Sequence, residues 1–211
     1  MSPAVAVQAE PSARERILDA AVERIATEGI DGVRIARIAM DARVSTSLVH
    51  YHFDSREALL AEALLHSFEL AGDVRIGERN GDATSHADTL AAMIDQCMPY
   101  PGAAERDWIL WVELWLRAVR RPELRDTAAR LYARMHEWLA SEIAAGVAAG
   151  EFADCKVDAL TDRVLALLDG LGVRALLGDP SMPVQRARGE VWRVLAAELG
   201  LDGEMPARAN G

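Results

Sequence analysis

The sequence has few of the features on which several protein classes depend. Its two cysteines, Cys97 and Cys155, are isolated, without a C-x-x-C or Cys/His spacing, so neither a disulfide framework nor a metal site is indicated. Its uncharged apolar runs are far shorter than the roughly 18 residues of a membrane span. The opening residues MSPAVAVQAEPSA lack the basic and apolar regions of a signal peptide. We therefore expect a cytoplasmic protein with reduced cysteines, no metal and no membrane partner.

Motifs of catalysis and of cofactor binding are also missing. The sequence contains no G-x-S-x-G, phosphate-binding loop, dinucleotide-binding glycine pattern or H-E-x-x-H motif. No nucleophile lies at a recognisable spacing from a candidate base. We therefore predict that the protein is not an enzyme and uses no cofactor.

Helical periodicity runs through most of the chain, and the alternation typical of strands is absent. Hydrophobic residues make up 51% of the sequence, which is ample for burying a core. The pattern predicts an all-α fold of about nine helices. The first predicted helix spans 12–29, and two short helices follow within 33–53. The next begins after Ser55 and ends within 72–85. The remaining predicted helices span 86–98, 105–120, 123–149, 158–177 and 184–199.

Residues 33–53, VRIARIAMDARVSTSLVHYHF, have the pattern of a helix-turn-helix. Ile38 and Ala39 give the first short helix an apolar side, and a break at residues 41–43 interrupts the period. Ser45 is a suitable N-cap for the second helix. That helix is anchored by apolar side chains behind and is polar in front, which suits insertion into the major groove of DNA.

The net charge of −10 argues at first against a nucleic-acid partner. Residues 1–60 contain seven Arg and nine acidic residues, a net charge of −2, whereas residues 32–53 contain three Arg and one Asp, a net charge of +2. A local basic face is therefore possible at the helix-turn-helix. Because counterion release scales with the number of phosphates contacted, we expect weak non-specific binding.

The run from Ile17 to Leu64, with ILDAA, the EG turn, YHF and SREALL, resembles the N-terminal DNA-binding domain of the TetR family of bacterial transcriptional regulators. The resemblance implies an N-terminal three-helix domain at residues 1–60, with a loose arm at 1–11, and a C-terminal helical effector-binding and dimerisation domain at 61–211. It also implies a dimer that binds a palindromic operator as a repressor and is released by a small molecule. The family usually has Gly where this chain has Arg43, so a left-handed backbone there carries about 1 kcal/mol of strain.

Charge and position divide the expected DNA contacts into two groups. Metal binding by the H-x-H pair is not expected, because two residues apart on a helix the side chains diverge by about 200°. We assign phosphates to Arg34, Arg37 and Arg56, the groove to Thr46, Ser47, His50 and Tyr51, and either packing or a phosphate contact to His52.

Residues 164–173 are apolar or small on nearly every side, so the helix that contains them must be covered. In proteins of the resembled family the final two helices pack with those of a partner as a four-helix bundle. The alternative is a monomer that buries them internally. We assign the dimer interface to Leu168, Gly172, Trp192 and Leu195.

Three tryptophans of the segment 105–120 lie on one side of its predicted helix, and they either belong to the core or line an apolar cavity. Two acidic residues within apolar segments, Glu113 and Asp169, need partners, and these are either a cationic ligand or an Arg such as Arg117 or Arg174. A small cationic amine is the effector that this composition favours. The predicted ligand site comprises Met93, Trp111, Glu113, Leu114, Trp115, Met135, Trp138 and Asp169.

A second interpretation remains open at this level. The chain is then an all-α small-molecule-binding or scaffold protein that has lost DNA binding, and its acidic net charge is the feature that favours this reading. Binding to DNA from upstream of its own gene separates the two interpretations.

Overall fold

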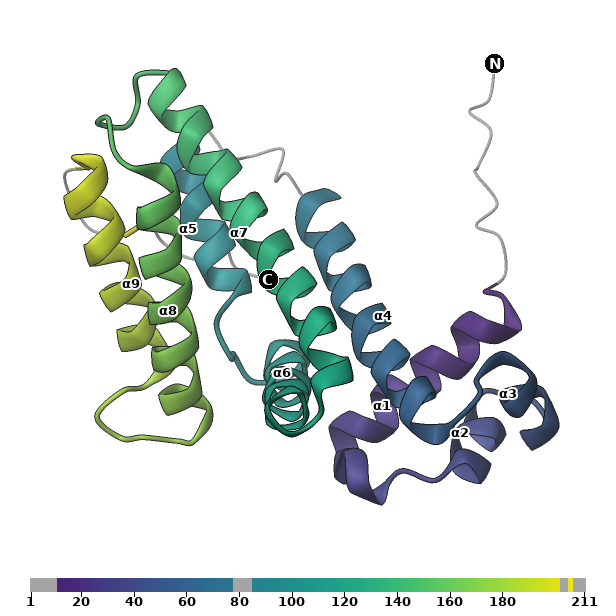
Figure 1. Ribbon diagram of the computed structural model, residues 1–211. Coiled ribbons are helices and arrows are strands. Elements are labelled where there is room, and N and C mark those ends of the chain that lie inside the picture. Colours follow the sequence, from purple (N-terminus) through teal and green to yellow (C-terminus); the bar gives the residue numbers. More distant parts are fainter. Residues whose placement is uncertain (1–10, 78–84, 202–204, 207–211) are drawn as a thin grey trace, which may run out of the picture. The chain divides into compact units, whose positions relative to one another are not determined.

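A computed structural model describes residues 11–77, 85–201 and 205–206, and within these ranges it contains nine α-helices, one short 3-10 helix and no strand (Figure 1). The all-α prediction is thereby confirmed. The predicted loose arm, apart from Pro11, lies outside the described residues. The chain divides into two compact units, Met1–Ser67 and Phe68–Gly211. None of the described helices is long and apolar enough to cross a lipid bilayer.

The N-terminal unit contains α1 (Ala13–Gly32), α2 (Ile35–Asp41), α3 (Thr46–His52) and the beginning of α4 (Arg56–Gly77). Ser12 and Glu15 form a capping box at the start of α1. Gly29 interrupts α1 where the sequence predicted an end, because its backbone is not helical (φ 69°, ψ 155°), and a short helical segment follows it as far as Gly32. The buried core of this unit includes Ile17, Leu18, Ile25, Ile38, Val49, Leu59 and Leu64.

The C-terminal unit contains α5 (His86–Gln96), α6 (Ala103–Arg120), the 3-10 helix η1 (Pro122–Leu124), α7 (Arg125–Ala148), α8 (Val157–Leu176) and α9 (Val184–Leu199). Helix α8 packs between α7 and α9, α5 contacts both α7 and α9, and α6 contacts α7 (Figure 1). The predicted helices agree with these within a few residues. Both cysteines are free, as predicted.

The four residues assigned to the dimer interface lie inside the subunit. Leu168, Trp192 and Leu195 belong to the buried core of the C-terminal unit. Gly172 is buried against Trp108 of α6. The prediction treated the apolar helix as a surface for a partner, whereas α5, α6, α7 and α9 of the same chain cover these positions. Side chains buried in this way are not accessible to a partner chain.

Gly172 provides the space that Trp108 occupies. A Cβ atom at Gly172 would lie 2.1 Å from Cη2 and 2.2 Å from Cζ2 of Trp108. The indole is also held by a hydrogen bond of 3.1 Å, in which Nε1 donates to the carbonyl oxygen of Cys97. Glycine within a helix costs about 1 kcal/mol relative to alanine, and here the close approach of an aromatic ring requires it.

We expect Gly172→Ala to lower the free energy of unfolding by about 1–3 kcal/mol, although Ala is the better helix former, because the new methyl group overlaps the indole. Urea unfolding measures the effect. Because a phenyl ring is shorter than an indole, the double variant Trp108→Phe/Gly172→Ala should recover part of the loss relative to Trp108→Phe. Equal effects of Gly172→Ala in both backgrounds would contradict the assigned contact.

Candidate DNA-binding and effector sites

Helix α3 is held from behind and exposes its polar side chains. The Ser45 hydroxyl caps it by accepting a hydrogen bond of 3.1 Å from the Leu48 backbone N–H. Val49 anchors the helix in the core with 1% of its surface exposed. The side chains predicted to face the groove are all exposed, and Tyr51 is 81% exposed. The exposed set is Thr46, Ser47, His50 and Tyr51.

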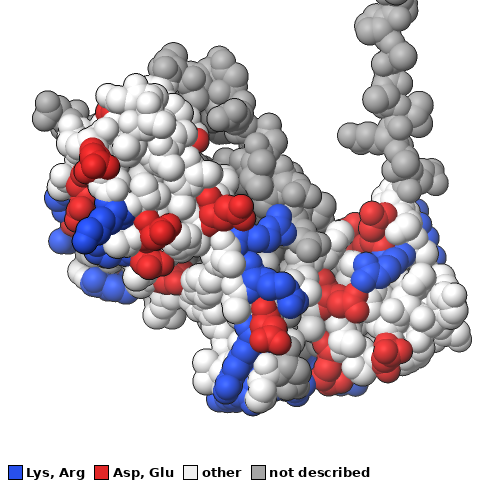
Figure 2. Space-filling model, turned by 45° about the horizontal axis from the view of Figure 1, so that its top comes forward, with Lys and Arg blue, Asp and Glu red and all other residues white. Residues whose placement is uncertain are grey.

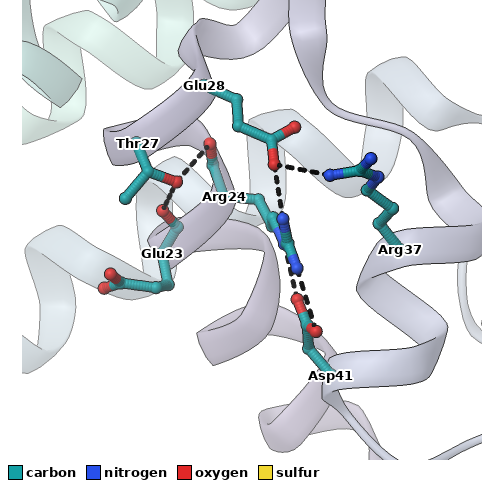
Figure 3. Close-up of polar contacts among 6 residues, drawn as sticks. All are labelled: Glu23, Arg24, Thr27, Glu28, Arg37 and Asp41. Atoms are coloured by element: carbon teal, nitrogen blue, oxygen red, sulfur yellow. Dashed lines mark hydrogen bonds and ion pairs between the residues drawn. The ribbon is translucent and has the colours of Figure 1, made fainter.

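An ion-pair network joins α1 to α2 beside this helix (Figure 3). Arg24 donates to both carboxylate oxygens of Asp41, at 2.6 and 3.1 Å, and also to Glu28. The Arg24 hydrogen bonds lower the pKa of Asp41 below its usual value. Arg37 reaches the same Glu28 at 3.4 Å, so part of its charge is already balanced.

The other predicted phosphate contacts have different environments. Arg34 is exposed and forms no ion pair or hydrogen bond through its side chain within the described residues. Arg56 instead donates to the backbone carbonyl oxygens of Ile30, Asp31 and Val33, at 2.7, 3.3 and 3.1 Å. These bonds tie α4 to the end of α1, and we therefore remove Arg56 from the predicted phosphate contacts.

His52 is half-buried and packs edge-on against Tyr51, with ring centroids 5.3 Å apart. Packing is therefore the role that this environment supports, of the two that were left open.

Figure 2 shows acidic and basic side chains intermixed on the face that it draws.

A small cavity in the C-terminal unit has three tryptophans in its lining. Trp108, Trp111 and Trp115 of α6 line it together with Met135 of α7 and Leu168 of α8. Trp115 contacts both other tryptophans, with ring centroids 6.3 Å from Trp108 and 5.9 Å from Trp111. The cavity volume is about 20 Å³, which is enough for one water molecule. We call this space the aromatic cavity.

The polar lining of the aromatic cavity consists of Gln96, Asp107 and Asp169, and it contains no Lys or Arg. Asp169 accepts a hydrogen bond of 2.6 Å from the Tyr132 hydroxyl. Burial raises the pKa of Asp169, and burial together with the bond to Asp169 raises the pKa of Tyr132 above the usual phenol value. Tyr132 therefore remains protonated as the donor, and Asp169 is a carboxylate without a cationic partner in its pair.

An open groove lies on the other side of this pair. It has a volume of about 440 Å³ and is lined by residues of α7 and α8. Both Tyr132 and Asp169 belong to its lining, and His136 and Asp162 lie farther along it, 3.5 Å apart. The ring of Tyr132 stacks on Trp115, with centroids 6.3 Å apart and planes inclined by 9°. Tyr132 therefore lies between the groove and the aromatic cavity.

The structure brings together half of the predicted ligand residues. Trp111, Trp115, Met135 and Asp169 line the aromatic cavity. Met93 and Leu114 are buried elsewhere in the core, and Trp138 packs against the core. Glu113 lies 3.9 Å from Arg117, one of the alternatives considered for it. Arg174, the other, pairs with Asp179 at 2.7 Å.

Tyr132 was the main residue that the prediction missed, although its spacing of three residues from Met135 places both on one side of α7. Trp108 was noticed only as a member of the tryptophan cluster. Gln96 and Asp107 carried no local signal, because their role depends on how α5 and α6 meet.

Helix α3, the second helix of the motif, is capped, exposed and packed on α1 and α2. This arrangement defines the helix-turn-helix class of DNA-binding proteins. Residues 17–63 match the description "Bacterial regulatory proteins, tetR family", and residues 83–200 match "BetI-type transcriptional repressor, C-terminal". The chain belongs to the TetR family, as the resemblance predicted, and its C-terminal domain is of the BetI type. It is a ligand-responsive DNA-binding transcriptional regulator.

Known proteins with similar sequences and structures agree with this assignment. The HTH-type transcriptional regulator BetI 1 of Chromohalobacter salexigens is 26% identical over 183 residues, covering 85% of this chain and 86% of that protein. A Saccharomonospora viridis protein described as a transcriptional regulator, solved in complex with choline, is 33% identical with a TM-score of 0.76, covering 87% of this chain and 95% of that one. The multidrug binding protein EbrR, solved with proflavin, is 25% identical with a TM-score of 0.61, covering 87% and 99%.

Glu28 reduces the charge that Arg37 presents to DNA. We expect Glu28→Gln to strengthen binding to any duplex by roughly two- to fivefold, because it releases Arg37 and removes one negative charge near the phosphates. Fluorescence anisotropy with a labelled duplex at several salt concentrations measures this. Glu137→Gln, an equal change of charge on the exposed side of α7, serves as the control. Weaker binding by Glu28→Gln would show that Glu28 serves mainly to position Arg24 and Arg37.

Proposed function

We propose that the protein is a homodimeric repressor that binds a palindromic operator and releases it when a small organic cation occupies the aromatic cavity. The two α3 helices of the dimer enter successive major grooves, so the two-fold symmetry of the protein is repeated in the DNA. Arg34 and Arg37 contact phosphates. The bases are read by the exposed α3 residues Thr46, Ser47, His50 and Tyr51.

The lining of the aromatic cavity carries the proposal of a cationic effector. Indole faces attract a cation by about 0.5–2 kcal/mol each when desolvated, and a carboxylate beside them adds a charge-assisted contact. Here Trp108, Trp111 and Trp115 meet Asp107 and Asp169 around one space without Lys or Arg. The choline bound to the Saccharomonospora viridis protein supports a quaternary ammonium compound as the effector.

The cavity must enlarge before it admits such a ligand. At about 20 Å³ it holds one water molecule, and a trimethylammonium group is several times larger. The Tyr132 side chain is the wall nearest the groove. Its hydroxyl donates a hydrogen bond to Asp169 but carries no charge that would balance the carboxylate. An incoming cation replaces that hydroxyl at Asp169, and rotation of the Tyr132 ring joins the cavity to the groove. The ligand then favours the conformation with the displaced Tyr132, and its effect on DNA binding cannot exceed its difference in affinity for the two conformations.

The proposed dimer interface is the exposed side of α8 and α9. Gly170 of α8 and Leu177, its C-cap residue, are exposed, and Leu177 has 79% of its surface accessible. A Cβ atom at Gly170 or at Gly189 of α9 would meet nothing within 4 Å, so packing within the subunit does not require glycine there. The close approach of a second copy would explain glycine at both positions, because two backbones pack more tightly where side chains are absent.

We expect choline to change the tryptophan fluorescence of the wild-type protein, and Asp169→Asn to weaken its binding by about tenfold or more. The cation binds the ionised carboxylate, so wild-type affinity should fall as pH decreases through the raised pKa of Asp169. Affinity of Asp169→Asn should stay low and change less with pH. Glu113→Gln, which alters a carboxylate outside the cavity lining, is the control and should bind choline like the wild type.

Two results would overturn the cationic effector. One is equal binding of choline and of its neutral carbon isostere, and the other is unchanged choline affinity in Asp169→Asn. Glycine betaine should bind more weakly than choline, since its carboxylate is repelled by Asp107 and Asp169.

The substitution Gly170→Arg should convert the dimer to monomers, because the two-fold axis brings two unpaired cations together at a penalty of several kcal/mol. Light scattering coupled to gel filtration measures the mass. Ala103→Arg, an exposed position on α6, should remain dimeric. Leu168→Arg is not an equivalent test, since it places a charge in the core and destabilises the subunit itself. A dimeric Gly170→Arg would exclude this side of α8 from the interface.

A further inference from the structure

Helix α2 ends in a turn that requires a left-handed residue. The backbone N–H of Val44 donates to the carbonyl oxygen of Ala39 at 2.9 Å, and that of Arg43 donates to Met40 at 3.1 Å. This pair of bonds is the Schellman motif, in which the residue after the C-cap adopts positive φ. Arg43 has φ 55° and is, within the described part of the chain, the one residue other than glycine with positive φ.

Three other helices of the chain end in the same way and use glycine. In α7, α8 and α9 the residue after the glycine donates to the carbonyl oxygen five residues earlier, at 3.0, 3.1 and 2.9 Å. The glycines at the left-handed position are Gly150 (φ 73°), Gly178 (φ 70°) and Gly200 (φ 68°). A side chain with a Cβ atom is disfavoured there, so the arginine at the end of α2 is a departure that strains the turn.

The Arg43 side chain obtains no compensating contact from the residues that the structure describes. It is exposed and makes no hydrogen bond or ion pair with any described residue. Its nearest acidic neighbour in the sequence, Asp41, is held by two hydrogen bonds from Arg24. Of the arginines described in the N-terminal unit, Arg34 and Arg43 share this freedom. Arg34 is the N-cap of α2, and Arg43 follows its C-cap, Ala42.

We propose that Arg43 contacts a DNA phosphate, and that this contact is the reason for retaining a strained arginine at the turn. Helix α3 contains no Lys or Arg, so the charge that attracts the phosphates on either side of its groove has to come from flanking segments. Arg43 precedes Ser45, the N-cap of α3, by two residues. Strained backbone conformations are concentrated at functional positions. The inference rests on the proposed operator binding and adds a contact to it.

The substitution Arg43→Gly separates strain from function, because stability and DNA affinity should change in opposite directions. We expect its melting temperature to rise by about 2–4 °C. Its affinity for DNA should fall by about tenfold, and the slope of log K against log salt concentration should become shallower by about 0.9 for each subunit bound. The probes are a labelled duplex from upstream of the gene and a random-sequence duplex of equal length, and both should lose affinity, since phosphates carry no sequence information.

Two further variants of the full-length protein provide controls. Arg43→Lys keeps both the charge and the strain, so its melting temperature and salt slope should remain close to those of the wild type. Gly150→Arg makes the reverse change at the end of α7, where a Cβ atom would meet nothing within 4 Å. It should lower the melting temperature by about the amount that Arg43→Gly gains and leave the salt slope unchanged.

An equal salt slope for the wild type and Arg43→Gly on both duplexes contradicts the phosphate contact and leaves the proposed function standing. An Arg43→Gly protein that melts no higher than the wild type contradicts the strain on which the inference depends. Absence of binding to either duplex by the wild type contradicts the proposed function together with this inference.

Discussion

A partly buried carboxylate beside aromatic rings is the constraint on which the proposed effector site depends. Asp169 lies beside the tryptophans of α6, and its hydrogen-bond donor in this structure is the Tyr132 hydroxyl. Burial of a carboxylate is unfavourable without a charged partner, and a neutral phenol offsets part of that cost. The aromatic rings are held in place by their own contacts, including the stacking of Tyr132 on Trp115. The effector that we propose is a cation that replaces Tyr132 at Asp169.

In the N-terminal unit the electrostatic constraint is the repulsion between the protein and DNA, because its segment 1–60 has a net charge of −2. Several of its arginines are committed to other groups: Arg24 to Asp41 and Glu28, and Arg56 to three backbone carbonyls. Few guanidinium groups remain for phosphates, which limits non-specific attraction. In the proposed dimer, specific recognition then depends more heavily on the exposed polar residues of α3 and on two-fold symmetry.

Local signals predicted the elements well, because they act over a few residues. The N-cap of α3 at Ser45 lies where the pattern indicated. The effector and interface residues were harder to predict, because they depend on which side of a helix meets which neighbour. Gly170 and Gly172 illustrate the difficulty. They are two positions apart, yet one faces open space and the other faces Trp108.

The same limit explains why buried positions of α8 and α9 were assigned to a partner although helices of the same chain cover them. Apolar residues on nearly every side of 164–173 showed that the helix is enclosed, but sequence periodicity contains no information on whether the enclosing helices belong to the same chain. Tyr132 was missed for a related reason, since its importance comes from Asp169, 37 residues away in the sequence.

The release of DNA by an organic cation tests the central claim most directly. A labelled duplex from upstream of the gene is bound by the wild-type protein and by Asp169→Asn, and its anisotropy is followed while choline chloride replaces sodium chloride at constant ionic strength. We predict that choline dissociates the wild-type complex and leaves the Asp169→Asn complex bound at the same concentration. Equal behaviour of the two complexes, or equal release by the neutral isostere of choline, would contradict it.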